Sequence, residues 1–114
     1  MTNGLMLKAG QKARLVVLIS GSGSNLQSLI DACDAGLLNA EIVAVISNKS
    51  GVYGLARATA ANIPNIPIDH RAFDSREEFD ESLAQIIESY QPDLVVLAGF
   101  MRILTGHFIN HWLD

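Results

Sequence analysis

The 114-residue sequence has little of what several protein classes require. It has one cysteine, Cys33, so no internal disulfide can form and a reducing compartment is expected. No hydrophobic run approaches the length of a membrane span, and the apolar run at residues 5–7 is too short for the core of a signal peptide. These absences predict a cytoplasmic protein without a membrane partner.

Basic charge is also scarce. The formal net charge is −4, with five basic and three acidic residues in 1–57 and three basic and nine acidic residues in 58–114. Neither half contains a basic run, and aromatic residues make up only 6% of the chain, so nucleic acid is not an expected partner. No two histidines stand with cysteine or carboxylates in a metal-ligand arrangement, and no metal is expected.

Four apolar, β-rich runs alternate with four helical patterns along the chain. The runs cover residues 15–20, 41–47, 66–68 and 93–99. This alternation of strands and helices predicts an α/β fold, with a doubly wound and mainly parallel sheet and right-handed crossovers. Prolines flank the third run and place it near a sheet edge. The last helical pattern, from about Thr105, is followed by no further strand, so we expect a domain cut short.

Local signals predict where two of the helices begin and end. Ser24 or Asn25 is expected to cap the first helix and Gly36 to end it. The apolar stripe of this helix is Leu26, Leu29, Ile30, Cys33 and Leu37. Ser75 and Glu78 predict a capping box at the start of the third helix.

The stretch LVVLISGSGSNLQSLI, residues 15–30, raises three alternatives: an ordinary strand-to-helix turn, a dinucleotide loop, or a cradle for one phosphate. A helix N-terminus presents unpaired N–H groups and a positive dipole end, which suit an anion. Gly21 and Gly23 let the backbone approach a phosphate. The added side-chain donors are Ser22, Ser24 and Asn25.

A dinucleotide loop is the least favoured of the three. Leu26 stands where the dinucleotide fingerprint has its third glycine. The second run ends in Ser47, Asn48 and Lys49, where that fingerprint has an acidic residue for the ribose, although Lys49 leaves a 2′-phosphorylated cofactor open. The residues favour a monophosphate first and a plain structural turn second.

A second informative stretch is VVLAGFMRILTGH, residues 95–107. It follows the fourth run, at the strand end where open α/β sheets bind ligands. Met101, Ile103 and Leu104 offer an apolar wall suited to a flat heteroaromatic ring, and Arg102 can reach solvent or hold a carboxylate. From the spacing alone, core packing is the favoured explanation of these residues.

Four segments together carry a family resemblance. LVVLISGSGSNLQSLIDAC, AVISNKSGVYGLARA, FDSREEFD and PDLVVLAGFMRIL are similar to the phosphoribosylglycinamide formyltransferases, folate-dependent enzymes of purine biosynthesis. The resemblance runs from residue 14 to about residue 112. It implies a formyltransferase-type sheet truncated after about four βα units, with strand order beginning 3-2-1-4, residues 1–13 as a flexible tail and 14–114 as the N-terminal part of the domain.

The resemblance also implies ligands and site residues. Glycinamide ribonucleotide is the implied substrate, and 10-formyltetrahydrofolate the implied cosubstrate. The residues matching the substrate-phosphate loop are Gly23, Ser24 and Asn25. The residues matching the family's folate site are Arg76, Met101, Arg102, Ile103 and Leu104.

The catalytic asparagine, histidine and aspartate of the family have no counterpart in the chain. The first two lie in an N-I-H-P-S run, which does not occur in this sequence. Asn110 and His111 precede the position of that run, and they are assigned no catalytic role; His70 and His107 are interpreted as surface or helix-end histidines. The implied function is the ligand-binding half of a formyltransferase, inactive alone and able to self-associate or dock with the missing part. The alternative is a non-catalytic phosphate-binding or assembly module.

Overall fold

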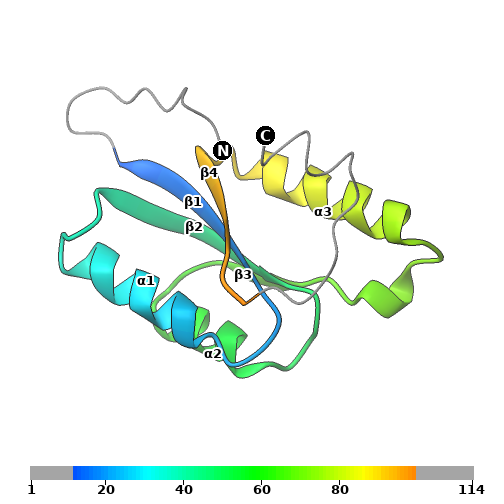
Figure 1. The fold of residues 1–114 in the computed structure, drawn as a ribbon, viewed down its shortest axis with the longest axis horizontal. Helices are drawn as coiled ribbons and strands as arrows, with labels where there is room; N and C mark the ends of the chain where they lie inside the picture. The colour runs from blue at the N-terminus through cyan, green and yellow to red at the C-terminus, as the bar shows by residue number, and fades with distance from the viewer. Residues whose placement is uncertain (1–11, 100–114) are drawn as a thin grey trace.

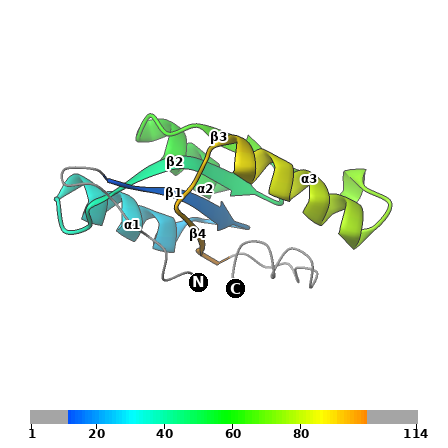
Figure 2. The same cartoon turned by 90° about the horizontal axis from the view of Figure 1, so that it is seen from above.

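A computed structural model describes residues 12–99 and confirms the predicted α/β class. The four strands are parallel and lie side by side in the order β3-β2-β1-β4, which the family resemblance implied (Figure 2). The elements are β1 (Ala13–Ile19), α1 (Ser24–Asp34), β2 (Ala40–Ser47), α2 (Tyr53–Ala60), β3 (Asn65–Pro67), the 3₁₀ helix η1 (His70–Ala72), α3 (Arg76–Ser89) and β4 (Leu94–Leu97). None of the helices within 12–99 is long and apolar enough to cross a membrane.

Helices cover both faces of the sheet, with α1 and α2 on one face and α3 on the other (Figure 1). The central strand β1 alternates between the two layers. Val17 and Ile19 pack toward α1 and α2, whereas Val16 and Leu18 pack toward α3, and all four are 0% exposed. Burying each such side chain stabilises the fold by about 1.5–3 kcal/mol. β1 is therefore packed on both faces up to Ile19, where the loop to α1 begins.

The ends of the elements agree with the sequence in most places. β3 is an edge strand, as its prolines predicted. Ser75 is the N-cap of α3, and its hydroxyl accepts the N–H of Glu78 at 3.1 Å. β4 is shorter than the predicted run 93–99, since Asp93 at one end and Ala98 and Gly99 at the other lie outside the strand.

The apolar stripe predicted for α1 is wrong at its end. The helix stops at Asp34, and Gly36 with φ 74° turns the chain into the left-handed region. Leu37 therefore points away from the helix and is 79% exposed. Cys33 is half-buried against the core, and burial, followed by the nearby Asp34 carboxylate, raises the pKa of its thiol.

Several predictions fall outside the described residues. They concern the N-terminal tail up to residue 11 and the final helical pattern from Thr105, together with the side chains at 101–104, 107, 110 and 111.

Candidate functional site

The carboxyl ends of β1, β2 and β4 meet at one edge of the sheet. The N–H of Asn48 donates to the Ile19 carbonyl at 3.3 Å, and the N–H of Ala98 donates to the Leu18 carbonyl at 2.9 Å. β2 and then β3 are added on one side of β1, whereas β4 is added on the opposite side of β1. The strand order therefore reverses between β1 and β4, and such a switch point is where open α/β sheets bind ligands.

The loop after β1 brings Gly23, Ser24 and Asn25 to the start of α1. Gly23 is buried, whereas Ser24 and Asn25 are exposed. The first bond within the helix runs from the Gln27 N–H to the Gly23 carbonyl at 2.8 Å. Helix geometry leaves the three preceding N–H groups, of Ser24, Asn25 and Leu26, without a partner inside the helix. Together with the helix dipole, this end of α1 can bind an anion.

The cap of α1 differs from the prediction. Gly23, not Ser24 or Asn25, is the N-cap, with φ 77° and ψ 27°, and no side chain caps the helix. The backbone of Gly23 is left-handed, a conformation that a residue with a Cβ adopts only with strain. This turn places Ser24 already inside the first turn of the helix. The hydroxyl of Ser24 and the amide of Asn25 are therefore not used as caps.

Two glycines allow the loop to lie directly on α2. A Cβ added to Gly23 would stand 2.7 Å from the Gly54 Cα. A Cβ added to Gly54 would stand 2.8 Å from the Gly21 carbonyl oxygen and would also meet the Ile19 side chain. Gly54 was not singled out from the sequence, where a glycine near a helix start is an ordinary feature. Its role depends on this contact between distant segments.

The end of β2 carries no carboxylate. Ser47 closes a tight turn, in which its hydroxyl accepts the Lys49 N–H at 3.0 Å and donates to the Lys49 carbonyl at 2.7 Å. Asn48 is 3% exposed. The position at which a dinucleotide fold holds a ribose is thus occupied by a hydroxyl, an amide and an amine, in agreement with the sequence.

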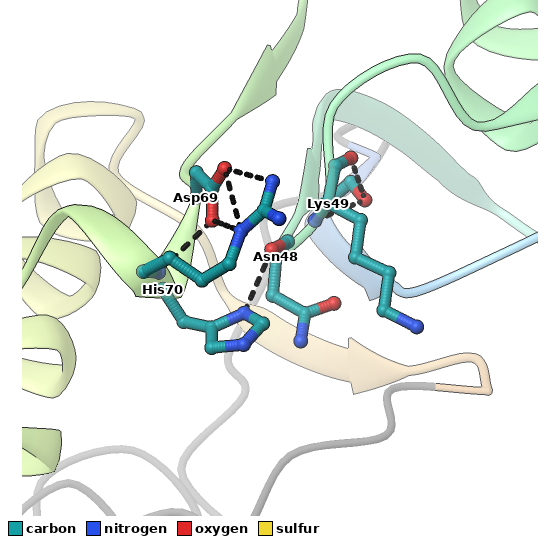
Figure 3. A network of polar contacts seen from close by, with 6 residues as sticks. Asn48, Lys49, Asp69 and His70 are labelled. Carbon is teal, nitrogen blue, oxygen red and sulfur yellow. Dashed lines mark hydrogen bonds and ion pairs between the residues drawn. The ribbon is translucent and has the colours of Figure 1, made fainter.

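A second polar group of residues stands beyond β2 and β3 (Figure 3). The His70 Nδ1 lies 3.3 Å from the Asn48 carbonyl oxygen, and Arg71 pairs with Asp69 at 2.9 Å. Lys49, His70 and this ion pair line a cleft of about 270 Å³. Hydrogen bonds from Arg71 hold the pKa of the Asp69 carboxyl at about 2, below its usual 3.8. The pair therefore favours the folded state above pH 3.8, and this contribution is lost as the pH falls through about 2.

The remaining predicted site residues are not brought together by the described part of the structure. Arg76 is the exposed first residue of α3, on the opposite face of the sheet from α1. Met101, Arg102, Ile103 and Leu104 lie outside the described residues, a short way along the chain from β4. Among residues 12–99, no group of three or more His, Cys, Asp or Glu side chains could hold a metal ion.

The sequence matches one protein family over almost its whole length. A family model described as Formyl transferase matches residues 13–114. The chain is 51% identical over 98 residues to the phosphoribosylglycinamide formyltransferase of Escherichia coli K12, covering 86% of this chain and 46% of the relative. It is 50% identical over 104 residues to the trifunctional purine biosynthetic protein adenosine-3 of Drosophila melanogaster, covering 90% of this chain and 8% of the relative.

Solved structures agree with these matches. The phosphoribosylglycinamide formyltransferase of Coxiella burnetii superposes with a TM-score of 0.86 at 50% identity, covering 89% of this chain and 47% of that one. The glycinamide ribonucleotide transformylase 1 of Symbiobacterium toebii superposes with a TM-score of 0.87 at 39% identity, covering 97% of this chain and 53% of that one. The chain thus spans about half the length of these solved structures and less than half of the two curated relatives.

Proposed function

The chain belongs to the formyl transferase family, and on this premise we propose that it carries the ligand-binding part of a glycinamide ribonucleotide formyltransferase. The donor is 10-formyltetrahydrofolate, the acceptor is the amine of glycinamide ribonucleotide, and the reaction serves purine biosynthesis. The printed names of the relatives support this choice within the family. The observation that carries the proposal is the loop at residues 21–25, whose buried glycine and exposed donors suit a phosphate monoester.

The loop supplies the anchor for the ribonucleotide. Gly23 lets the backbone approach the phosphate, and the N–H groups of Ser24 and Asn25 donate to its oxygens. The side chains of the same two residues are exposed at the start of α1 and add further donors. Anchoring the phosphate fixes the distant amine in place, which converts an encounter between two molecules into a reaction within one complex.

The folate site, in this proposal, is built by residues that follow β4 in the chain. Met101, Ile103 and Leu104 form an apolar wall for the pterin ring, with backbone groups that read the edge of the ring. Arg76 and Arg102 provide cations for the carboxylates of the folate. The short path along the chain from β4 to residue 101 supports this placement beside the phosphate loop.

The chemistry requires groups beyond these anchors. The amine attacks the formyl carbon, a new C–N bond forms, the bond from that carbon to N10 of the folate breaks, and a proton passes from the amine to N10. Groups that stabilise the oxyanion or move the proton typically contribute factors of about 10²–10⁴. Because the family's N-I-H-P-S run does not occur among the 114 residues, we assign binding to this chain and no catalytic residue.

One observation favours the alternative of an assembly module. β4 is an edge strand in the described sheet, and its Leu97 is 45% exposed. An apolar edge strand is a surface for association. In our proposal this edge docks with the remainder of the enzyme, and in the alternative it docks with a second copy. In both cases we propose a cytoplasmic location, because a single cysteine allows no internal disulfide and suits a reducing compartment.

Formyl transfer separates the two functions. The assay uses the protein as its gene encodes it, with 10-formyltetrahydrofolate and either glycinamide ribonucleotide or glycinamide, and measures release of tetrahydrofolate. We expect transfer to the ribonucleotide and at least about a hundredfold lower kcat/KM for glycinamide, which has no phosphate to anchor. Equal kcat/KM values for the two acceptors would contradict the proposed role of the loop as a phosphate anchor. No transfer to either acceptor would favour the non-catalytic assembly module.

A further inference from the structure

Two carbonyl groups of the phosphate loop, those of Gly21 and Ser22, accept hydrogen bonds from α2. The N–H of Gly54 donates to the Gly21 carbonyl at 3.0 Å, and the Nε of Arg57 donates to the Ser22 carbonyl at 2.7 Å. Both donors belong to α2, more than thirty residues away from the loop in sequence (a separation of 35 for the Arg57 contact). Gly21 and Ser22 are therefore bound to α2 through their carbonyl groups, whereas Ser24 and Asn25 are exposed.

Arg57 is itself held in place from two further directions. Its Nη1 donates to the Gln27 Oε1 on α1 at 3.3 Å, and its guanidinium carbon lies 4.7 Å from the centre of the Tyr53 ring. The side chain is half-buried. A planar guanidinium can donate in two directions and stack on a ring at once, whereas the lysine ammonium cannot reproduce this geometry. Arg57 thus joins the loop, α1 and α2.

Holding a carbonyl also fixes the direction of the next N–H. No described peptide bond is cis, and in a trans peptide the C=O of one residue and the N–H of the next point in opposite directions. The bond from Arg57 to the Ser22 carbonyl therefore directs the Gly23 N–H away from the Arg57 guanidinium. The bond from Gly54 to the Gly21 carbonyl directs the Ser22 N–H away from Gly54 in the same manner.

We propose that Arg57 is a positioning residue, which holds the Ser22 carbonyl so that the Gly23 N–H is presented to the phosphate of the substrate. This inference rests on the proposed function, because that function makes the loop the phosphate site. Arg57 acts through the loop backbone and does not touch the ligand. A phosphate bound by a preorganised N–H loses less free energy in ordering the loop than one bound by a mobile turn.

Arg57→Ala should weaken phosphate binding without a matching loss in turnover. Hydrogen bonds to a charged group support an expected increase of roughly tenfold in the KM for glycinamide ribonucleotide. We expect kcat to stay within about twofold, because saturating ribonucleotide still fills the site and positions its amine. The KM for the formyl donor should stay unchanged, because the donor does not contact the loop. Arg57→Lys keeps the charge but not the fork, and should recover less than half of the lost binding free energy.

The matched control is Arg71→Ala. This substitution removes the same positive charge from a side chain that is 78% exposed and pairs with Asp69. It should leave the KM values for the ribonucleotide and for the formyl donor unchanged. The thermal midpoint of each variant checks folding. If Arg57→Ala does not fold, Arg57→Lys carries the test with a smaller expected rise in KM.

A direct binding measurement keeps this inference separate from the proposed function. Inorganic phosphate is titrated into the protein as its gene encodes it, and the Gly23 amide signal is followed by NMR. We expect the dissociation constant for phosphate to rise about tenfold in Arg57→Ala and not in Arg71→Ala. Unchanged phosphate affinity in a folded Arg57→Ala variant overturns the inference. A wild-type protein that binds phosphate in this Arg57-dependent way but transfers no formyl group overturns only the proposed function.

Discussion

Asn25→Asp should raise the dissociation constant for glycinamide ribonucleotide by a hundredfold or more. The new carboxylate would stand in the exposed first turn of α1, where the proposal places the doubly charged phosphate. Two like charges about 4 Å apart near a protein surface repel by about 4 kcal/mol for each pair of unit charges, before screening by salt. Affinity is measured by isothermal titration calorimetry with the protein as its gene encodes it.

The same substitution should not destabilise the fold. An acidic residue in the first turn of a helix interacts favourably with the helix dipole, by about 0.3–1 kcal/mol. The urea midpoint should therefore stay level or rise slightly. Gly23→Asp would be a poorer test, because φ at Gly23 is 77° and a Cβ there would stand 2.7 Å from the Gly54 Cα.

Ser28→Asp is the control for Asn25→Asp. Ser28 is an exposed residue of the same helix, one turn further on, and its hydroxyl donates to the Ser24 carbonyl. It adds the same charge without placing it at the loop, so affinity should fall by less than about threefold. If both variants lost affinity equally, the effect would come from the general charge of the helix, and the phosphate site would lie elsewhere.

The second large effect concerns activity. The 114-residue polypeptide by itself should transfer no formyl group above the uncatalysed rate, because it matches none of the family's catalytic residues. Losing oxyanion and proton-transfer groups removes about 10²–10⁴-fold for each. Mixing it with a separately expressed polypeptide that carries the N-I-H-P-S run should restore measurable transfer. Turnover by the 114-residue polypeptide alone, abolished by His111→Ala, would show that the catalytic assignment is wrong.

Restored activity should depend on the β4 edge. Leu97→Asp places a charge on a side chain that is 45% exposed at the sheet edge, and it should prevent the two polypeptides from docking. Leu37→Asp is the matched control, since Leu37 is 79% exposed in the turn after α1. Restoration that survives Leu97→Asp as well as Leu37→Asp would place the docking surface away from β4.

The sequence predicted the fold well where burial decides the structure. Residues 15–19 are apolar at every position, which a strand covered on both faces requires, and helices do cover both faces of β1. Pro64, directly before β3, and Pro67, its last residue, indicated an edge, because proline cannot donate to a neighbouring strand. These signals are local, so one sequence is enough to read them.

The details of the site depend on contacts that a single sequence does not contain. Ser24 and Asn25 resemble N-caps by residue type, but the left-handed turn at Gly23 moves the cap one residue earlier. Arg57 has the pattern of an ordinary helix-surface arginine, and its bond to the Ser22 carbonyl spans 35 residues. The orientation of the loop therefore depends on contacts with α2 that the sequence does not reveal.

The most direct measurement is an NMR titration of the isotope-labelled protein, as its gene encodes it, with glycinamide ribonucleotide. We expect the amide signals of Gly23, Ser24 and Asn25 to move together and to saturate with one dissociation constant. The signals of Lys49 and Arg71, at the cleft beyond β2 and β3, should stay in place. If the ribonucleotide moved the signals of that cleft instead, or moved none in a folded protein, the loop after β1 would not be the phosphate site.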